Sequence, residues 1–369
     1  MKTLVVIVTH NCSAAFEHCW AIVEPLLDEH VRACVVDNAS TDPAQLQQLE
    51  TLPTGVVTRL ANNVGYGGAI NHALGLSELE LSGTARAVGD AVDRDARTAT
   101  QPQPTSGGTP RAEPDYILCL NPDAYLQPDC LPLLIKAIEA NETLASVAPL
   151  MLSAEDPAVI DGAGDVLSIS GYAWRRWHGR RVDTVNTFAD ISSDTSLDIS
   201  SSTSLNRSPV DRSPVFGACA GACLYRLSAL REIGGFDPDY FMYVEDTDVA
   251  LRLRMAGWSC AFVPKAVVHH EGSATTGYRS DFSVYHGHRN ALRLLCKNFP
   301  LWLLPPSLAL HLLASLLLLP RMAARGQLWV FLKAKWAGLL LMPAAFRARR
   351  DRKDRLSLPQ WLSIFFNPQ

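Results

Sequence analysis

The sequence lacks a strong charge of either sign, a cysteine framework and a long apolar run at its N-terminus. Lys and Arg total 33 against 37 Asp and Glu, and this net charge of −4 argues against a general nucleic-acid binder. The nine cysteines are scattered, and Cys219 and Cys223 have no second pair at zinc-finger spacing, so free thiols in a reducing cytosol are expected. The apolar run Leu4–Val8 is short and precedes no Ala-x-Ala site, so we expect a buried strand there rather than a signal peptide.

Short apolar runs alternate with helix-compatible stretches along the first third of the chain. The expected strands are Leu4–Val8, Arg32–Asp37, Val56–Leu60 and Tyr116–Leu120, and the expected helices are Ser13–Leu27 and 66–81. This alternation predicts an α/β fold with a mostly parallel central sheet. Two polar segments, at about 83–114 and 183–214, interrupt it and hold a single aromatic residue between them. Because neither can bury enough apolar surface to order itself, we expect mobile surface insertions.

The tail from residue 281 onward is both apolar and basic. Leu301–Leu319 and Leu328–Phe346 are each about long enough to cross a hydrocarbon core of roughly 30 Å. A two-span hairpin would, however, carry Arg321 and Arg325 across the membrane. We therefore expect helices that lie in the cytoplasmic membrane interface, with a soluble helical subdomain or true spans as the alternatives. The expected division is one domain at 1–280 and a membrane-associated helical region at 281–369.

Polar side chains follow several of the expected strands, where ligands of open α/β sheets bind. Thr9 and Asn11 follow the first strand, and Asp37 ends the second. The glycine-rich stretch Asn62–Asn71 resembles a phosphate-binding loop that runs into a helix, although it contains no Gly-Lys-Ser/Thr. In Asn121-Pro122-Asp123, the last residue is either a ligand for a divalent cation or part of an Asn-Pro-Asp turn.

The most informative stretch of the chain is acidic. Glu245, Asp246 and Asp248 lie within four positions in an apolar frame. Crowding and lost hydration raise the pKa of at least one such carboxyl, which prepares a general base, but acids also complement the dipole at a helix N-terminus. Further on, His269 and His270 follow an apolar run, and an imidazole there could join a carboxylate on a metal ion.

In this order, the pieces resemble the inverting glycosyltransferases of family 2, which have the GT-A nucleotide-sugar-binding fold. The resemblance covers residues 4–273 and rests on these stretches: Val6–Asn11, Val36–Asp42, Asn63–Asn71, Leu120–Asp123, Gly234–Asp237, Glu245–Asp248 and His269. Rhamnosyltransferase-like enzymes of bacterial surface polysaccharide assembly share the pattern Phe-x-Tyr-x-Glu-Asp-x-Asp and a basic, leucine-rich tail. The resemblance implies that Asp246 is the catalytic base, with Glu245 and Asp248 as secondary candidates.

The resemblance also implies which residues bind ligands. The donor-binding residues would be Thr9, Asn11, Asp37, Asn71 and Asn121. The first three would hold the nucleoside, and Asn71 would lie near the ribose or diphosphate. Asp123, the last acid of the family's Asp-x-Asp motif, would bind Mg²⁺ or Mn²⁺ together with His269, or with His270 if the motif is displaced by one residue.

The implied reaction is a single displacement that inverts the anomeric centre. The resemblance favours dTDP-rhamnose as the donor, with UDP-sugars next, and a glycan or polyprenyl-linked hydroxyl as the acceptor at the inner face of the cytoplasmic membrane. The Gln-x-x-Arg-Trp motif of processive members does not occur, which favours addition of one or a few sugars. Trp174–Trp177 could contact sugar or phosphate, and Gly217–Cys223 either packs in the core or floors the acceptor pocket. The main alternative is a catalytically inactive, membrane-attached nucleotide-sugar-binding or scaffold protein.

Overall fold

The computed structural model describes residues 1–53, 55–75, 113–185, 215–272, 279–351, 354 and 356–366. The two expected insertions lie almost entirely outside these described residues. The first four strands are β1 (Thr3–Thr9), β2 (Val31–Asp37), β3 (Val57–Arg59) and β4 (Tyr116–Leu120). They are parallel and lie in the spatial order β3-β2-β1-β4, with Thr9 and Asp37 in register at the ends of neighbouring strands. The α/β prediction for this half of the chain is confirmed.

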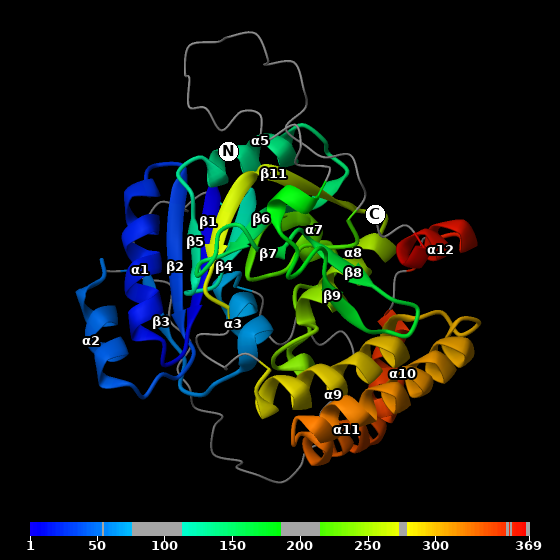
Figure 1. The fold of residues 1–369 in the computed structure, drawn as a ribbon. Coiled ribbons are helices and arrows are strands. Elements are labelled where there is room, and N and C mark those ends of the chain that lie inside the picture. Colours follow the sequence, from blue (N-terminus) through cyan, green and yellow to red (C-terminus); the bar gives the residue numbers. More distant parts are fainter. Residues whose placement is uncertain are drawn as a thin grey trace.

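Helices cover both faces of this parallel half, because successive side chains of a strand point to opposite faces. Val5 and Ile7 of β1 pack with α1 (Ser13–Val23), α2 (Pro43–Thr51) and α5 (Cys130–Glu139). Val6 and Val8 pack on the other side with α3 (Gly65–Ala73), α7 (Leu227–Glu232) and α8 (Glu245–Met255). Figure 1 shows α1 and α3 on opposite sides of the strands. The β-branched run at the N-terminus therefore forms a strand that is buried on both faces.

The remaining strands extend the sheet with mixed directions. They are β5 (Ala124–Leu126), β6 (Leu144–Ser153), β7 (Ile160–Gly162), β10 (Ala222–Arg226) and β11 (Ser259–His270). The full order is β3-β2-β1-β4-β10-β6-β11-β5, with β7 paired to β6. Strand β10 is antiparallel to both of its neighbours, whereas β11 runs parallel to β6. The sheet thus continues past β4, and the polar loops after β4 and β11 lie at the same edge.

A separate two-stranded hairpin lies beside this edge. It consists of β8 (Asp165–Leu167) and β9 (Ala173–Arg175), which are antiparallel with Asp165 directly opposite Arg175. The sequence patterns did not predict this hairpin, because strands of three residues are too short to show a two-residue period. It places two charged side chains on one face of the hairpin.

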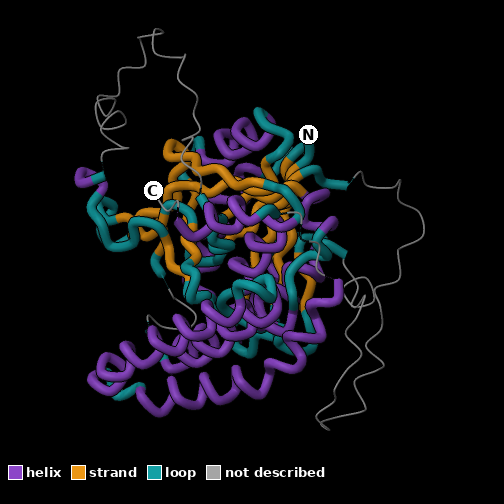
Figure 2. Tube along the Cα trace, turned by 90° about the vertical axis from the view of Figure 1, so that its right-hand side faces the viewer, coloured by secondary structure: helices purple, strands orange, loops and turns teal. Residues whose placement is uncertain are grey.

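The C-terminal helices form a layer along one side of the sheet domain (Figures 1 and 2). The layer consists of α9 (Asp281–Asn298), α10 (Leu304–Ala324) and α11 (Leu328–Arg347), and a further helix, α12 (Leu358–Phe366), lies apart from it and contacts β8. The described 3₁₀ turns are Glu24–Leu26, Val182–Thr184, Pro238–Tyr240 and Ala348–Asp351. Judged by length and composition alone, α10 and α11 are long and apolar enough to cross a membrane. Large apolar side chains on both helices face outward, including Leu317 and Trp336.

Candidate active site

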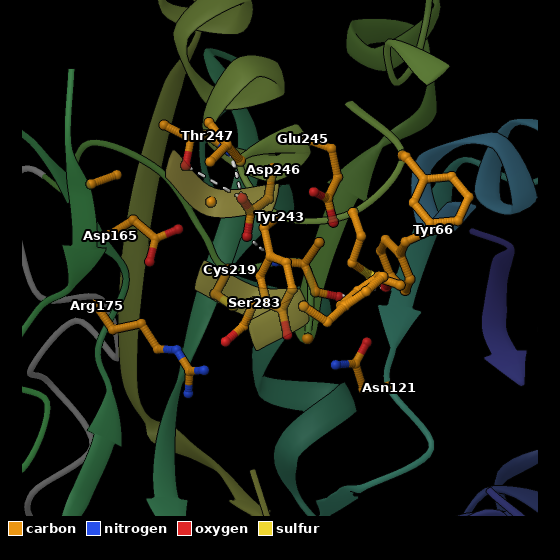
Figure 3. Close-up of a pocket in the computed structure, with 18 of the residues that line it drawn as sticks. Tyr66, Asn121, Asp165, Arg175, Cys219, Tyr243, Glu245, Asp246, Thr247 and Ser283 are labelled. Carbon is orange, nitrogen blue, oxygen red and sulfur yellow. Dashed lines mark hydrogen bonds between the residues drawn. The ribbon is translucent and has the colours of Figure 1, made fainter. Parts of the chain in front are cut away.

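A cavity of about 810 Å³ lies at the edge of the sheet where the polar loops meet. Its walls come from the loops after β1, β2 and β4, from the β8–β9 hairpin, from the segment 219–221, from the segment 241–247 and from the first half of α9. Figure 3 shows Asp165 and Arg175 on one side of it, Tyr66 and Asn121 on the other, and Asp246 between them. The described part of the chain therefore gathers carboxylates, amides and a guanidinium in one place.

Asp246 lies in the cavity wall in a fixed orientation. Its carboxylate accepts hydrogen bonds from the backbone amide of Thr247 at 2.7 Å, from the Thr247 hydroxyl at 3.3 Å and from the Ala220 amide at 3.4 Å. The segment before it is bent by positive φ angles at Phe241, Tyr243 and Val244. Non-glycine residues adopt such angles at a cost, and the surrounding structure must hold them. The bend places Asp246 in the first turn of α8 and aims it at the cavity (Figure 3).

Glu245 and Asp248 have different environments from Asp246. Glu245 also lines the cavity, but it is buried, and burial together with the charge of Asp246 raises its pKa well above the usual range. Asp248 does not line the cavity; it is fully buried and bonded to Arg252 and Lys297. Both interpretations of the acidic stretch therefore apply, since the acids begin a helix and one of them has a raised pKa.

Asp123 and His270 form the pair that fits a divalent cation. The Nε2 atom of His270 lies 3.4 Å from Oδ1 of Asp123, is buried, and has no hydrogen-bond partner among the described residues. His270 Nδ1 lies 2.8 Å from Asp161, which fixes the ring. Burial opposes protonation of His270, but Asp123 and Asp161 outweigh it and raise its pKa to about 9. No group of three or more His, Cys, Asp or Glu suited to a metal is found in the described chain, so other ligands would be phosphate oxygens or water.

His269 lies on the opposite side of β11 from His270, because neighbouring residues of a strand alternate in direction. It is half-buried, pairs in register with Tyr125 and does not line the cavity, whereas His270 does. The structure therefore brings Asp123 together with the alternative candidate and not with the first choice.

Of the five expected donor-binding residues, Asn121 lines the cavity and the other four do not. Thr9 is buried at the end of β1, and Asp37 accepts from the Ser40 amide and pairs with Arg59 at 3.3 Å. Asn11 accepts from the amides of the Thr41–Asp42 turn at 2.8 and 2.9 Å. Their sequence neighbours His10 and Asn38 line the cavity in their place.

The glycine-rich stretch supports the bent segment that precedes Asp246. The Tyr66 amide donates to the Phe241 carbonyl at 2.8 Å, and a side chain at Gly65 would overlap that carbonyl. Asn71, the expected ribose or diphosphate contact, bonds through its amide to the backbone of Phe236 at 2.7 and 2.9 Å. Gly65 and Gly67 thus permit a close approach of α3 to segment 236–241, because a side chain at either position would overlap that segment.

Several residues that line the cavity belong to no motif in the sequence, or only to stretches whose role the sequence left open. Trp174 and Arg175 line the cavity, whereas Arg176 turns away and stacks on Trp177 at 4.1 Å. The small residues Cys219, Ala220 and Gly221 also line it. Asp165 and the α9 residues Phe282, Ser283 and His288 belong to no motif recognised in the sequence.

Comparisons with known proteins add to this geometry. A family model described as glycosyl transferase family group 2 matches residues 116–347. N-acetylglucosaminyl-diphospho-decaprenol L-rhamnosyltransferase of Mycobacterium tuberculosis is 27% identical over 275 residues, which is 74% of this chain and 77% of the relative. Rhamnosyltransferase WbbL of Escherichia coli is 30% identical over 159 residues, 42% of this chain and 51% of the relative. The solved mannosyltransferase PcManGT of Pyrobaculum calidifontis, in complex with GDP-Man and Mn²⁺, is 16% identical with a TM-score of 0.45, covering 95% of this chain and 88% of that one.

Proposed function

The chain belongs to glycosyl transferase family group 2, and from that premise we propose that it transfers rhamnose from a nucleoside diphosphate to a hydroxyl of a glycan or polyprenyl-linked acceptor in surface polysaccharide assembly. Family membership makes it a glycosyltransferase with the GT-A fold. The observation that carries the finer proposal is the placing of Asp246 in one cavity with Asp123 and His270. The relatives named for rhamnosyl transfer, one of them to a diphospho-decaprenol acceptor, support the sugar and the acceptor class.

The geometry supports a single displacement in which Asp246 is the general base. Its carboxylate removes the proton of the acceptor hydroxyl while the hydroxyl oxygen bonds to the anomeric carbon. The bond from that carbon to the donor phosphate oxygen breaks, and the electron pair leaves with the nucleoside diphosphate. Thr247 and Ala220 orient the base through the hydrogen bonds described above. Asp123 and His270 would hold a divalent cation, which when bound neutralises charge on the departing diphosphate.

A thermal-shift screen against nucleotide sugars tests this function. We expect dTDP-rhamnose with Mn²⁺ to raise the melting temperature, because a ligand that binds only the folded state stabilises it. Release of dTDP in the presence of a polyprenyl-linked acceptor then separates an enzyme from a sugar-nucleotide-binding scaffold. If only a UDP-sugar binds, the donor is that UDP-sugar and not dTDP-rhamnose. If a nucleotide sugar binds but no nucleoside diphosphate is released, the inactive scaffold is favoured.

Replacing Asp123 or His270 with alanine is expected to raise the Mn²⁺ concentration for half-maximal activity about tenfold or more, since even the outer partners of a metal site contribute that much to affinity. The matched control is His269→Ala, because His269 is the neighbouring residue of β11 and does not line the cavity. An equal effect of the two histidine substitutions would contradict the assignment of His270.

The helices α10 and α11 support the proposal that the protein works at a membrane surface. Leu317 and Trp336 have exposed fractions of 72% and 64%. The Lys333 Nζ atom lies over the ring of Trp329, 5.5 Å from its centroid. Apolar side chains next to basic ones are suited to the interface of an anionic bilayer. We propose that these helices attach residues 1–280 to the inner face of the cytoplasmic membrane.

The double substitution Leu317→Glu and Trp336→Glu is expected to weaken binding to anionic vesicles about tenfold or more. Each added charge near the surface is unfavourable by roughly 1 kcal/mol, in addition to the lost apolar burial. Co-sedimentation measures the bound fraction. Gln47→Glu, at an exposed position of α2 in the sheet domain, controls for an added charge. Undiminished sedimentation of the double variant would contradict membrane attachment through these faces.

A further inference from the structure

Asp165 is a buried carboxyl that faces the cavity and has no role in the mechanism above. It lies on β8, is 6% exposed and lines the cavity wall. Figure 3 shows its carboxyl directed into the cavity, on the same side as Arg175 and below Asp246 and Thr247. The hairpin β8–β9 places it there, because the Asp165 amide bonds to the Gly217 carbonyl at 2.9 Å and fastens β8 beside segment 217–221.

The carboxyl of Asp165 forms no ion pair with Arg175. Arg175 is directly opposite on β9, where an oppositely charged pair normally forms. The Arg175 guanidinium instead pairs with Asp161, which also binds His270 and His178. Within the described chain, the Asp165 side chain makes no hydrogen bond and no ion pair.

A buried carboxylate without a hydrogen-bond partner loses hydration, and this loss disfavours its charged form. Burial raises the pKa of Asp165 well above its usual range, the charge of Asp246 raises it further, and Arg175 offsets only part of this. A carboxyl that retains its proton both donates and accepts a hydrogen bond. The position therefore suits a neutral polar ligand, whereas a phosphate would be repelled by the charge of Asp246 in the same wall.

We propose that Asp165 binds a hydroxyl of a sugar in the cavity and is a specificity-determining residue of the transfer reaction. This inference rests on the proposed function, because a sugar must enter the cavity. The hydroxyl belongs either to the sugar of the donor or to that of the acceptor, and the experiment below separates the two sources.

Titration calorimetry with dTDP-rhamnose and with dTDP tests the donor side, using the full-length protein and Asp165→Ala. A bond to the donor sugar predicts about tenfold weaker binding of dTDP-rhamnose and unchanged binding of dTDP, which has no sugar beyond the nucleoside. A bond to the acceptor predicts that both are unchanged, while the KM for a polyprenyl-linked N-acetylglucosamine acceptor rises about tenfold. Asp165→Asn keeps the shape and serves as the conservative variant, for which we expect partial recovery.

Asp156→Asn is the matched control, because Asp156 lies in the same segment, is 55% exposed and does not line the cavity. Equal weakening of dTDP and dTDP-rhamnose, or no change in any of these constants, would overturn the assignment of Asp165. A fall in kcat without any change in binding would overturn it too, since Asp165 would then act in the chemical step. If the wild-type protein binds and transfers no nucleotide sugar, the proposed function fails and this inference falls with it.

Discussion

The variant Asp246→Asn is expected to transfer sugar about 10²–10⁴-fold more slowly than the wild type, which is the usual contribution of a general base. An asparagine at this position keeps the size of the side chain and one oxygen, which can still accept from the Thr247 amide, while its NH2 group replaces the oxygen that accepts the 3.4 Å bond from Ala220. It cannot take a proton from the acceptor hydroxyl. The bent segment and the cavity should therefore persist while kcat falls, and donor affinity should remain close to that of the wild type.

Glu245→Gln provides the matched control for this prediction. Glu245 is adjacent and lines the same cavity, but burial and the charge of Asp246 raise its pKa well above the usual range, which favours the protonated form that cannot act as a base. Single-turnover rates with saturating donor should show a much smaller loss for Glu245→Gln than for Asp246→Asn. Comparable turnover of Asp246→Asn and the wild type, or the reverse ranking of the two variants, would refute the choice of base.

The sequence contains enough local information to predict the parallel half of the fold. β1 is a run of apolar, largely β-branched residues that pairs with β2, the next strand of the chain, and β4 is a run of five apolar, buried residues. The hairpin that carries Asp165 and Arg175 was not predicted, because its contact with Gly217 joins residues far apart in the sequence across a segment outside the described residues. A cavity residue whose partners are so distant leaves no periodic signal.

The direction of a side chain was also harder to predict than its position. The motif around Thr9-His10-Asn11 does lie beside the cavity, yet His10 lines it and Asn11 holds the turn at residues 41–42. The choice between His269 and His270 is of the same kind, since a shift of one residue along a strand reverses the face. The motifs lie around the cavity, and the backbone geometry determines which of their members face it.

Asp248, unlike Asp246, has a structural role, and its loss should lower stability. Asp248 is fully buried and has four partners. Lys297 at 2.9 Å and Asn298 at 2.7 Å join it to α9, Arg252 of the same helix lies at 2.6 Å, and the Tyr240 hydroxyl donates to it at 3.0 Å. Burial opposes ionisation of Asp248, but the charges of Arg252 and Lys297 outweigh it and hold its pKa below the usual range. This network fixes the start of the base-bearing helix against the helix that forms the far wall of the cavity.

Asp248→Ala is therefore expected to lower the free energy of unfolding by about 3–5 kcal/mol, because it leaves Arg252 and Lys297 without their buried counter-charge. Asp239→Ala is the matched control: Asp239 pairs with Arg293 of α9 but is 61% exposed, so its loss should change stability by less than about 1 kcal/mol. Urea titration at several pH values measures both. Since the pKa of Asp248 is lowered by folding, its contribution is fully present above the unfolded value of about 4 and is lost as the pH falls further. The deficit of Asp248→Ala should thus shrink in acid, and a deficit that is small at pH 7 or independent of pH would contradict the stabilising role of this network.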